Sequence, residues 1–599
     1  MPRPRVLFCT AAGGEYGFGH LKRCTSVIDE GDRIFEGVLL IRGGTEAGNL
    51  KDRDILSRYS VCDNLENAGD VDLIISDQRD TGRSEIKGYT KRAPVISLDD
   101  RGAGRRFAHV TIFSLPTVEG FTGNYAGPSY IVIDRTIREA RKDRVQGSDV
   151  VVSFGGTDPH NLTEFVTRAL NRIEVKPLVV RGPLFTHKPP AGEYTPVENP
   201  ESMGEVLSRA AVLITSFGLT VYEALYLDIP VILYNHSRYH FELARSLTEP
   251  QNLGYHGALK EEVLSERLAQ VLSDRHRLIR SSAGNRVQID DRGAERIVSI
   301  IEKALQGSRK GCLFDHGVYT ALKRENTHTL MACSTCGDVF LYELEGPGDI
   351  YGDGDYFFSE YERQYGKSYV EDRENISRLG EARLDMIERC FTRRAVKGSG
   401  LSTLDHSAQS KKLLDVGCAL GFFMDVSRQR GWMPTGVEIS PFAARWVREH
   451  LGFSVVNASF LETEFQPESF DVITFFFVAE HFKDVEKVIE RAYTALKWGG
   501  LITFALPNRG GISYRIDRAR YVNEHPRDHY FDTSPRNLVR FLKQYGFRKL
   551  RVRTTGIHPE RFFRKLGMGR NIRLLDAIYN GIARVMRLGD TFEYYGVKI

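Results

Sequence analysis

The sequence predicts a multidomain α/β protein built on parallel sheets. Its 599 residues exceed what one hydrophobic core usually holds. Short apolar runs bounded by turn residues alternate with helical segments, which is typical of buried parallel strands. The alternation occurs in three successive series along the chain. Hydrophobic residues make up 41% and charged residues 27% of the chain, so we expect folded domains rather than disorder.

The first two series of apolar runs fill the amino-terminal half. They lie at residues 5–9, 37–41, 71–77, 94–100 and 109–113, and then at 149–156, 177–182, 211–218 and 229–235. Helical segments such as residues 161–173 separate the later runs. We therefore expect two Rossmann-like halves in tandem, over residues 1–145 and 146–307.

A glycine-rich loop follows the first predicted strand, in the stretch GFGHLKRC. Gly17 and Gly19 let the backbone turn tightly, which would present His20 and Arg23 to the cleft beyond the strand ends. His20 and Arg23 are therefore candidate catalytic residues. The alternative for His20 is a capping or core histidine.

Two further strand-to-helix loops predict a nucleotide site in the second half. Gly155 and Gly156 in SFGGTDPHNLT suit a phosphate, and the helix that begins near Thr220 offers amides to a diphosphate. Glu223, one turn further, suits a ribose. The predicted nucleotide-sugar-binding residues are Gly19, Gly155, Gly156, Thr157, Asn161, Ser216, Gly218, Thr220 and Glu223.

These motifs, in this order over residues 1–305, resemble the UDP-sugar hydrolase of pseudaminic acid synthesis. The Glu223 motif also resembles the N-acetylglucosaminyltransferase of peptidoglycan synthesis. The resemblance implies the GT-B fold, a UDP-linked sugar as substrate, and His20 as the group that activates water at the anomeric carbon. One position departs from the pattern, because Arg79 stands two residues after Asp77, where the hydrolases tend to have tyrosine. If a hydroxyl group replaces water, the same site becomes a glycosyltransferase.

A cysteine cluster opens the next predicted segment, residues 308–375. Cys312 and His316, with Cys333 and Cys336, can surround zinc tetrahedrally. The cluster and the aromatic stretch after it resemble the start of sugar methyltransferases that carry two Cys-x-x-Cys pairs. Asp315 occupies the usual second position of the first pair, so the fourth ligand stays open, as does a metal-free relic.

The third series of apolar runs predicts a domain over residues 376–557. The runs lie at residues 412–417, 434–440, 454–459, 470–478, 499–508 and 547–555. A small-residue loop follows the first run, and Glu438 ends the second, where a carboxylate can accept both hydroxyls of a ribose. A NAD-binding fold is disfavoured because the G-x-G-x-x-G spacing is absent.

From residue 411 to residue 557 the sequence resembles the class I S-adenosylmethionine-dependent methyltransferases. The resemblance implies that Asp415, Gly417 and Gly421 lie against the methionine part of the cofactor, and that Glu438 holds its ribose. Ser459 and Phe460 would flank the adenine, and Asp471 is a further cofactor-binding candidate. Ala419 departs from the pattern, because many members have glycine there.

His481 and His529 are the candidate catalytic bases of this domain. His481 follows the fourth strand, and His529 lies in the segment that usually covers the acceptor. A structural, hydrogen-bonded role is the alternative for each. The Asn-Pro-Pro-aromatic signature of adenine-amino methyltransferases is missing after the fourth strand, so exocyclic amines of nucleic acid are disfavoured as methyl acceptors.

The carboxy-terminal segment, residues 558–599, is predicted to be basic and amphipathic. Between residues 509 and 599 there are 20 Lys and Arg against 8 Asp and Glu, although the net charge of the whole chain is only +4. One helical face would be apolar, formed by Leu574, Leu575, Ile578, Ile582 and Val585. Such a helix either docks on its own domain or contacts anionic lipid peripherally.

The sequence thus predicts a cytoplasmic, bifunctional enzyme of surface-glycan biosynthesis. A nucleotide-sugar-dependent glycosyltransferase or hydrolase would be fused to a methyltransferase that uses S-adenosylmethionine and acts on a sugar or glycan. In the alternative, the amino-terminal half only binds a sugar nucleotide or glycan. The opening residues lack a secretory signal core, and no run approaches ~18 apolar residues.

Overall fold

The computed structural model describes most of the chain. The described residues are 2–12, 19–42, 56–116, 121–142, 147–182, 185–247, 251–274, 289–307, 311–348, 354, 356–396, 411–556, 581, 586 and 588–599. Gly17 and the five apolar residues predicted for the carboxy-terminal helix lie outside them. The chain divides into two compact units, residues 1–307 with 317–329, and residues 308–316 with 330–599.

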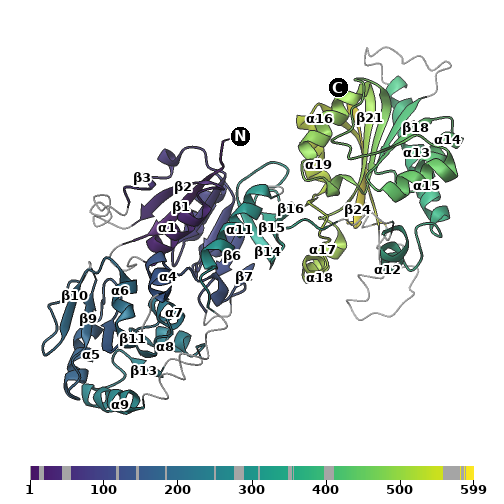
Figure 1. Cartoon of the computed structure of the whole chain (residues 1–599). Helices are drawn as coiled ribbons and strands as arrows, with labels where there is room; N and C mark the ends of the chain where they lie inside the picture. The colour runs from purple at the N-terminus through teal and green to yellow at the C-terminus, as the bar shows by residue number, and fades with distance from the viewer. Residues whose placement is uncertain are drawn as a thin grey trace. The chain divides into compact units, whose positions relative to one another are not determined.

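The first sheet of the first unit is parallel, in the order β3-β2-β1-β4-β5-β6-β7 (Figure 1). Its strands are β1 (Arg5–Ala11), β2 (Glu36–Arg42), β3 (Ser60–Cys62), β4 (Leu73–Asp77), β5 (Val95–Leu98), β6 (Val110–Phe113) and β7 (Tyr125–Ala126). The helices of this part are α1 (Gly19–Gly31) and α3 (Arg83–Thr90), and the following helix α4 (Arg135–Lys142) packs on α6 (Met203–Ser208) of the second sheet. The order places β1 beside β4, so the loops that follow these two strands meet at one edge of the sheet.

The second sheet of this unit is also parallel, in the order β10-β9-β8-β11-β12-β13. Its strands are β8 (Asp149–Ser153), β9 (Leu178–Arg181), β10 (Thr195–Glu198), β11 (Ala210–Thr215), β12 (Val231–Asn235) and β13 (Gln251–Tyr255). Its helices are α5 (Leu162–Asn171), α6 (Met203–Ser208), α7 (Leu219–Tyr226), α8 (Arg238–Ala244) and α9 (Glu261–Ser273). Helix α11 (Gly293–Gln306) returns to the first sheet and packs on α1. The first unit therefore contains two doubly wound parallel sheets.

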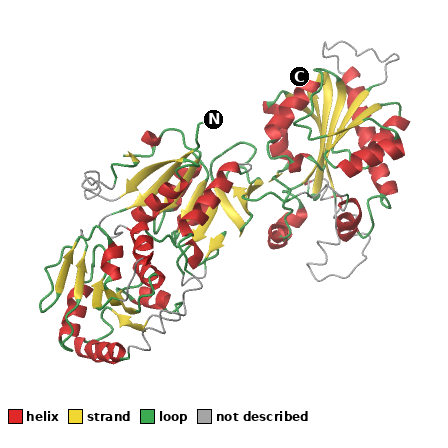
Figure 2. Ribbon diagram, viewed as in Figure 1, coloured by secondary structure: helices red, strands yellow, loops and turns green. Residues whose placement is uncertain are grey.

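The second unit is built on a seven-stranded sheet in the order β19-β18-β17-β20-β21-β24-β23. Its strands are β17 (Lys412–Val416), β18 (Met433–Glu438), β19 (Val455–Asn457), β20 (Phe470–Phe476), β21 (Leu496–Pro507), β23 (Phe547–Thr555) and β24 (Thr591–Lys598). Helices α16 (Val485–Ala495) and α19 (Pro535–Gln544) cover one face, and α13 (Arg373–Val396), α14 (Phe422–Gln429) and α15 (Pro441–Leu451) cover the other (Figures 1 and 2). The predicted α/β fold with parallel sheets is confirmed.

Several shorter elements complete the described chain. They are β14 (Tyr319–Glu325), β15 (His328–Cys333), β16 (Val339–Glu343), α12 (Tyr361–Tyr365), α17 (Ile512–Ile516), α18 (Arg518–Asn523) and β22 (Phe531–Asp532). Strand β16 pairs antiparallel with β22. Of the helices in the described part of the chain, none combines the length and the apolarity needed to cross a membrane.

Two predicted boundaries are wrong. Residues 558–599 are not wholly a separate tail, because β24 pairs antiparallel with both β21 and β23. Seven of its eight residues are buried, since the strand is covered on both faces and lacks the alternation of a surface element. The predicted segment 308–375 is also divided, because residues 317–329 pack on the first unit: Arg324 donates to the Ala108 carbonyl at 2.7 Å.

Candidate functional site

A histidine–aspartate pair lies at the edge of the first sheet. His20 is in the first turn of α1, and Asp77 ends β4. The Nδ1 atom of His20 lies 2.7 Å from Oδ1 of Asp77. Burial opposes ionisation of Asp77, but Arg23 and then His20 outweigh it and lower the pKa of this carboxyl group. Because the carboxylate stays charged, it holds the proton on Nδ1 and leaves Nε2 of His20 as an acceptor.

Arg23 lies one turn further along α1 and is buried, with 4% of its surface exposed. Its guanidinium donates to Asp77 at 2.7 Å, to Asp99, and to the hydroxyl of Ser114 at 3.2 Å. Asp99 has φ 47°, and its carboxylate also accepts from the Ser114 amide at 2.7 Å. The predicted catalytic role of Arg23 stays a prediction; its contacts are those of a cation that binds the buried Asp77 and the partly buried Asp99.

Two cavities of the first unit adjoin each other at Gly19, Gly155 and Gly156. The first cavity, about 410 Å³, extends toward Glu223. The second cavity, about 340 Å³, extends toward His20. Of the predicted nucleotide-sugar residues, those lining one or both cavities are Gly19, Gly155, Gly156, Thr157, Ser216, Gly218, Thr220 and Glu223.

Asn161 does not line either of these cavities, which departs from its predicted role. It takes a left-handed conformation, φ 51°, immediately before α5. The neighbouring Asp158 caps that helix, because its carboxylate accepts the amides of Leu162 at 2.9 Å and Thr163 at 2.8 Å. The motif therefore forms the start of α5, and Gly155 (φ 86°) supplies the turn before it.

Glu223 is half-buried on α7, beside Lys22 and Asp134 at the wall of the first cavity. Burial raises its pKa to about 7; Lys22 opposes this shift and Asp134 adds to it. A partly desolvated carboxylate is stabilised when ligand hydroxyl groups donate the hydrogen bonds that water no longer supplies. Glu223 is therefore suited to accept hydrogen bonds from a polyol.

A strained loop follows the first strand of the second unit. Gly417, Ala419 and Gly421 have φ values of 69°, 49° and 73°. A β-carbon at Gly417 would lie 2.6 Å from the side chain of Val478, so glycine is required there. Asp415 accepts from the Thr474 hydroxyl at 2.6 Å, and burial raises its pKa to about 7.

Glu438 ends the neighbouring strand β18. Its Oε2 accepts the amide of Ala419 at 2.9 Å and its Oε1 accepts the amide of Ser440 at 2.9 Å. Each oxygen keeps a further acceptor site, and burial raises the pKa of this carboxyl group. These properties fit a carboxylate that accepts two ribose hydroxyls of a nucleoside cofactor.

The other predicted cofactor residues fall into two groups. Ser459 and Phe460 follow β19, close to the same sheet edge, and the Phe460 ring is 1% exposed within the core. Asp471 is a correction, because it lies near the opposite end of the sheet, where β20 begins. There it accepts the Lys412 amide at 2.8 Å and pairs with Lys497 at 2.9 Å. A residue at the start of a strand lies far from the edge where parallel strands end.

Glu480, His481 and His529 bring one ligand atom each within 4.8 Å of the others. His481 Nδ1 lies 3.0 Å from the carbonyl and 3.1 Å from Oδ2 of Asp528, so its Nε2 is left as an acceptor. Glu480 is buried, which raises its pKa, and its Oε2 lacks a hydrogen-bond partner among the described residues. The two predicted histidines therefore lie close together. Glu480 lies beside them and was not predicted from the sequence.

Asp532 is a buried carboxylate that contacts the residues around His529. It lies 3.7 Å from His529 Nδ1 and 3.1 Å from His525 Nε2, and it accepts the hydroxyl of Tyr521. Burial disfavours the charged imidazolium of His529. Electrostatic attraction to Asp532, Glu480 and Asp528 nevertheless raises its pKa to about 9. His529 is thus a cation at neutral pH, a poor metal ligand but a good proton donor.

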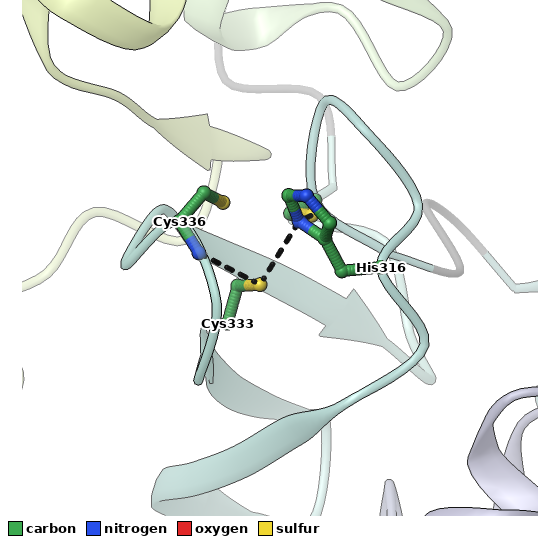
Figure 3. Close-up of side chains that lie close together, drawn as sticks. His316, Cys333 and Cys336 are labelled. Carbon is green, nitrogen blue, oxygen red and sulfur yellow. Dashed lines mark hydrogen bonds between the residues drawn. The ribbon is translucent and has the colours of Figure 1, made fainter.

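The four predicted zinc ligands converge in the second unit. Cys312, His316, Cys333 and Cys336 place their ligand atoms within 4.8 Å of one another. His316 Nδ1 is 3.3 Å from Cys312 Sγ and 3.4 Å from Cys333 Sγ, and the Cys336 amide points at Cys333 Sγ (Figure 3). Three cysteine thiols and one histidine with their ligand atoms this close together fit a tetrahedral zinc site.

Comparison with known proteins identifies part of the second unit. The family described as "Methyltransferase domain" matches residues 385–552, the segment that carries Glu438 and His481. These residues form a methyltransferase domain. The predicted Rossmann-like methyltransferase fold is therefore confirmed, and S-adenosylmethionine is the cofactor that this family and the Glu438 edge support.

Among the proteins that resemble the chain are two curated proteins and one solved structure. The "Spore coat polysaccharide biosynthesis protein SpsG" of Bacillus subtilis is 22% identical over 202 residues, 31% of this chain and 60% of that protein. The "Ubiquinone biosynthesis O-methyltransferase" of Saccharophagus degradans is 34% identical over 129 residues, 20% of this chain and 55% of that protein. A SAM-dependent methyltransferase structure from Archaeoglobus fulgidus is 18% identical, covers 40% of this chain and 98% of its own, and has a TM-score of 0.28. The chain thus spans little more than half the length of the two curated relatives.

Proposed function

We propose that the chain is a bifunctional enzyme of polysaccharide synthesis. In this proposal the methyltransferase domain methylates a sugar or glycan, and the first unit is a GT-B enzyme that transfers or hydrolyses a nucleotide-activated sugar. Its support is the similarity to a protein named for spore coat polysaccharide biosynthesis. The two parallel sheets of the first unit, with cavities at their facing strand ends, agree with this reading.

The observation that carries the first activity is the contact between His20 and Asp77. A histidine held through Nδ1 by an ionised carboxylate can take a proton at Nε2 from water or a hydroxyl group. That oxygen then attacks the anomeric carbon, and the bond to the diphosphate breaks. Gly155, Gly156 and the amino end of α7 would bind the diphosphate, and Glu223 the ribose.

In the methyltransferase domain, Glu438 would hold the ribose of S-adenosylmethionine, and the loop of Gly417 and Gly421 its methionine part. The cofactor supplies an electrophilic methyl group. His481, with Nδ1 fixed by Asp528, would take the proton from the acceptor hydroxyl or carbon. His529, charged at neutral pH, would orient the acceptor by donating a hydrogen bond. An Nε2 acceptor beside an imidazolium suits deprotonation of a weakly acidic sugar group.

The test of the first activity measures UDP release from a panel of UDP-sugars by the full chain. We expect His20→Ala to reduce release at least 100-fold, because it removes the general base. His187→Ala, which changes a histidine outside both cavities, is the control. UDP binding without any release by the wild type would instead favour a binding module.

The methyl acceptor is tested by transfer of label from radioactive S-adenosylmethionine to glycan extracts and to RNA. We expect label in glycan only, and His481→Asn should reduce it at least 100-fold while calorimetry shows unchanged binding of S-adenosylhomocysteine. Label in RNA would contradict the proposed acceptor class.

Zinc at Cys312, His316, Cys333 and Cys336 completes the proposal. Its role would be structural, because it joins the segment before β14 to the turn after β15. Elemental analysis of the purified chain should give about one zinc per molecule. Cys333→Ser should lose it, and Cys390→Ser, which lies outside the cluster, should keep it. A zinc-free wild type would contradict this part.

A further inference from the structure

The second cavity has two arginines in its wall that the proposed reaction does not use. Arg79 follows β4, two residues after Asp77, and Arg101 follows β5, two residues after Asp99. Both side chains line the cavity that His20 also lines. Because β4 and β5 are neighbouring parallel strands, their following loops are adjacent. The departure noted at Arg79 therefore comes to lie beside the candidate catalytic histidine.

The loops that carry these arginines are fixed to each other. The amide of Arg101 donates to the Arg79 carbonyl at 2.9 Å. Asp100 accepts the amides of Thr81 at 3.0 Å and Gly102 at 2.8 Å, as well as the Thr81 hydroxyl. A β-carbon on Gly102 would lie 2.3 Å from the Thr81 backbone, so the two loops touch closely. This framework holds the backbone of the arginine pair in place before any ligand arrives.

The surroundings of the pair are positively charged. The Arg101 guanidinium lies over the ring of Tyr239 at 4.7 Å, and its carboxylate neighbour Asp80, at 3.8 Å, is largely exposed. The acidic residue among the described side chains lining this cavity is Asp99, which Arg23 already binds. Burial, then Arg79 and other cations including Arg101, lower the pKa of the nearby His240 to about 4. The wall thus repels a further positive charge.

The two cavities differ in the charged residues that line them. Gly155, Gly156 and Thr220 line both cavities, whereas Arg79 and Arg101 line only the second, on the side of His20. If the diphosphate lies at the shared glycines and the nucleoside in the first cavity, the arginines face the sugar. Two guanidinium groups carried by these fixed loops favour a carboxylate or phosphate, with which they can form charge-assisted hydrogen bonds.

Resting on the proposed nucleotide-sugar activity, we propose that the first unit is specific for an acidic sugar, whose carboxylate or phosphate binds Arg79 and Arg101. Neutral nucleotide sugars could not form these charge-assisted hydrogen bonds with the pair. They should bind less tightly for that reason.

Calorimetry with the full chain tests this with two matched pairs of ligands and with UDP. UDP-glucuronate and UDP-glucose differ by a carboxylate at C6, and UDP-N-acetylmuramate and UDP-N-acetylglucosamine by a lactyl carboxylate at C3. We expect the acidic member of at least one pair to bind about tenfold or more tightly. Arg79→Gln with Arg101→Gln should reduce that ratio to about twofold or less and leave UDP affinity within about threefold. Arg106→Gln, exposed and outside both cavities, should change nothing.

The other outcomes separate this inference from the function on which it rests. Equal binding of acidic and neutral members in both pairs overturns the acidic-sugar subsite and leaves the nucleotide site standing. A double variant that weakens UDP as much as the sugars also overturns it, because the arginines then serve the diphosphate. Failure of UDP and all four sugar nucleotides to bind overturns both proposals.

Discussion

In each unit a buried aspartate holds a candidate catalytic histidine, but a different group balances its charge. Asp77 binds His20 and also Arg23, whose charge is permanent. Asp532 instead contacts Tyr521, His525 and His529. Because the charge of Arg23 is permanent, Asp77 stays compensated whether or not its histidine is charged. In the second site the compensating cation can itself lose its proton, so the site is expected to respond to pH.

Backbone strain gives a second comparison between the same two regions. Asp99 in the first unit and Ala419 in the second have φ values of 47° and 49°. Asp99 uses this conformation to accept from Ser114 and Arg23, whereas Ala419 has only its amide to offer, which donates to Glu438. Aspartate tolerates the left-handed region through local hydrogen bonds, and alanine does not.

Removal of the permanent cation tests the comparison most severely. Arg23→Met keeps most of the volume but leaves the buried Asp77 and the partly buried Asp99 without their cation, so the first unit should lose about 3–5 kcal/mol. Hydrogen exchange followed by mass spectrometry on peptides from β1 and β4 should show faster opening, and Arg106→Met should leave the rates unchanged. Unaltered exchange in Arg23→Met would mean that Arg23 does not balance these charges.

The pH response of His529 should be smaller and specific to the second unit. Because its pKa is raised to about 9, its contribution to stability is complete below the unfolded value near 6.5 and is lost as pH rises through 9, on the order of 3 kcal/mol in all. All three tryptophans, Trp432, Trp446 and Trp498, belong to this unit, so intrinsic fluorescence reports its melting selectively.

The wild type should therefore melt at progressively lower temperature between pH 6.5 and 9.5. His529→Gln should flatten this dependence, whereas His450→Gln, which changes an exposed histidine of the same unit, should not. Parallel pH curves for the wild type and His529→Gln would show that His529 is not the titrating group, and the contrast with Asp77 would fail.

The sequence predicts the strand-end loops well because parallel sheets gather them at one edge. Gly155 and Glu438 could be assigned to such edges from the apolar runs before them. Asp77 could not be paired with His20 from the sequence, since that contact joins segments 57 residues apart. Asp532 lies only three residues after His529, but the local pattern does not mark it as the partner of that histidine. Asp471 lies at the start of its strand, as predicted, and its assignment to the cofactor failed because parallel strands gather ligands at their opposite ends. Strand β24 was missed because its partners lie ~35 residues or more away.

Relief of backbone strain at Ala419 is the smallest effect expected. It tests the backbone contribution alone, because Ala419→Gly changes no charge. Ala419→Gly removes a conformational cost of about 1–2 kcal/mol but loosens the unfolded chain, so a net gain of about 1 kcal/mol is expected in denaturant melts followed by tryptophan fluorescence. Asp99→Gly should instead destabilise the first unit, because the hydrogen bonds to Ser114 and Arg23 are lost with the side chain. If Ala419→Gly destabilises the second unit, the β-carbon contributes packing that outweighs its strain, and the two left-handed residues are then alike in being favoured by their surroundings.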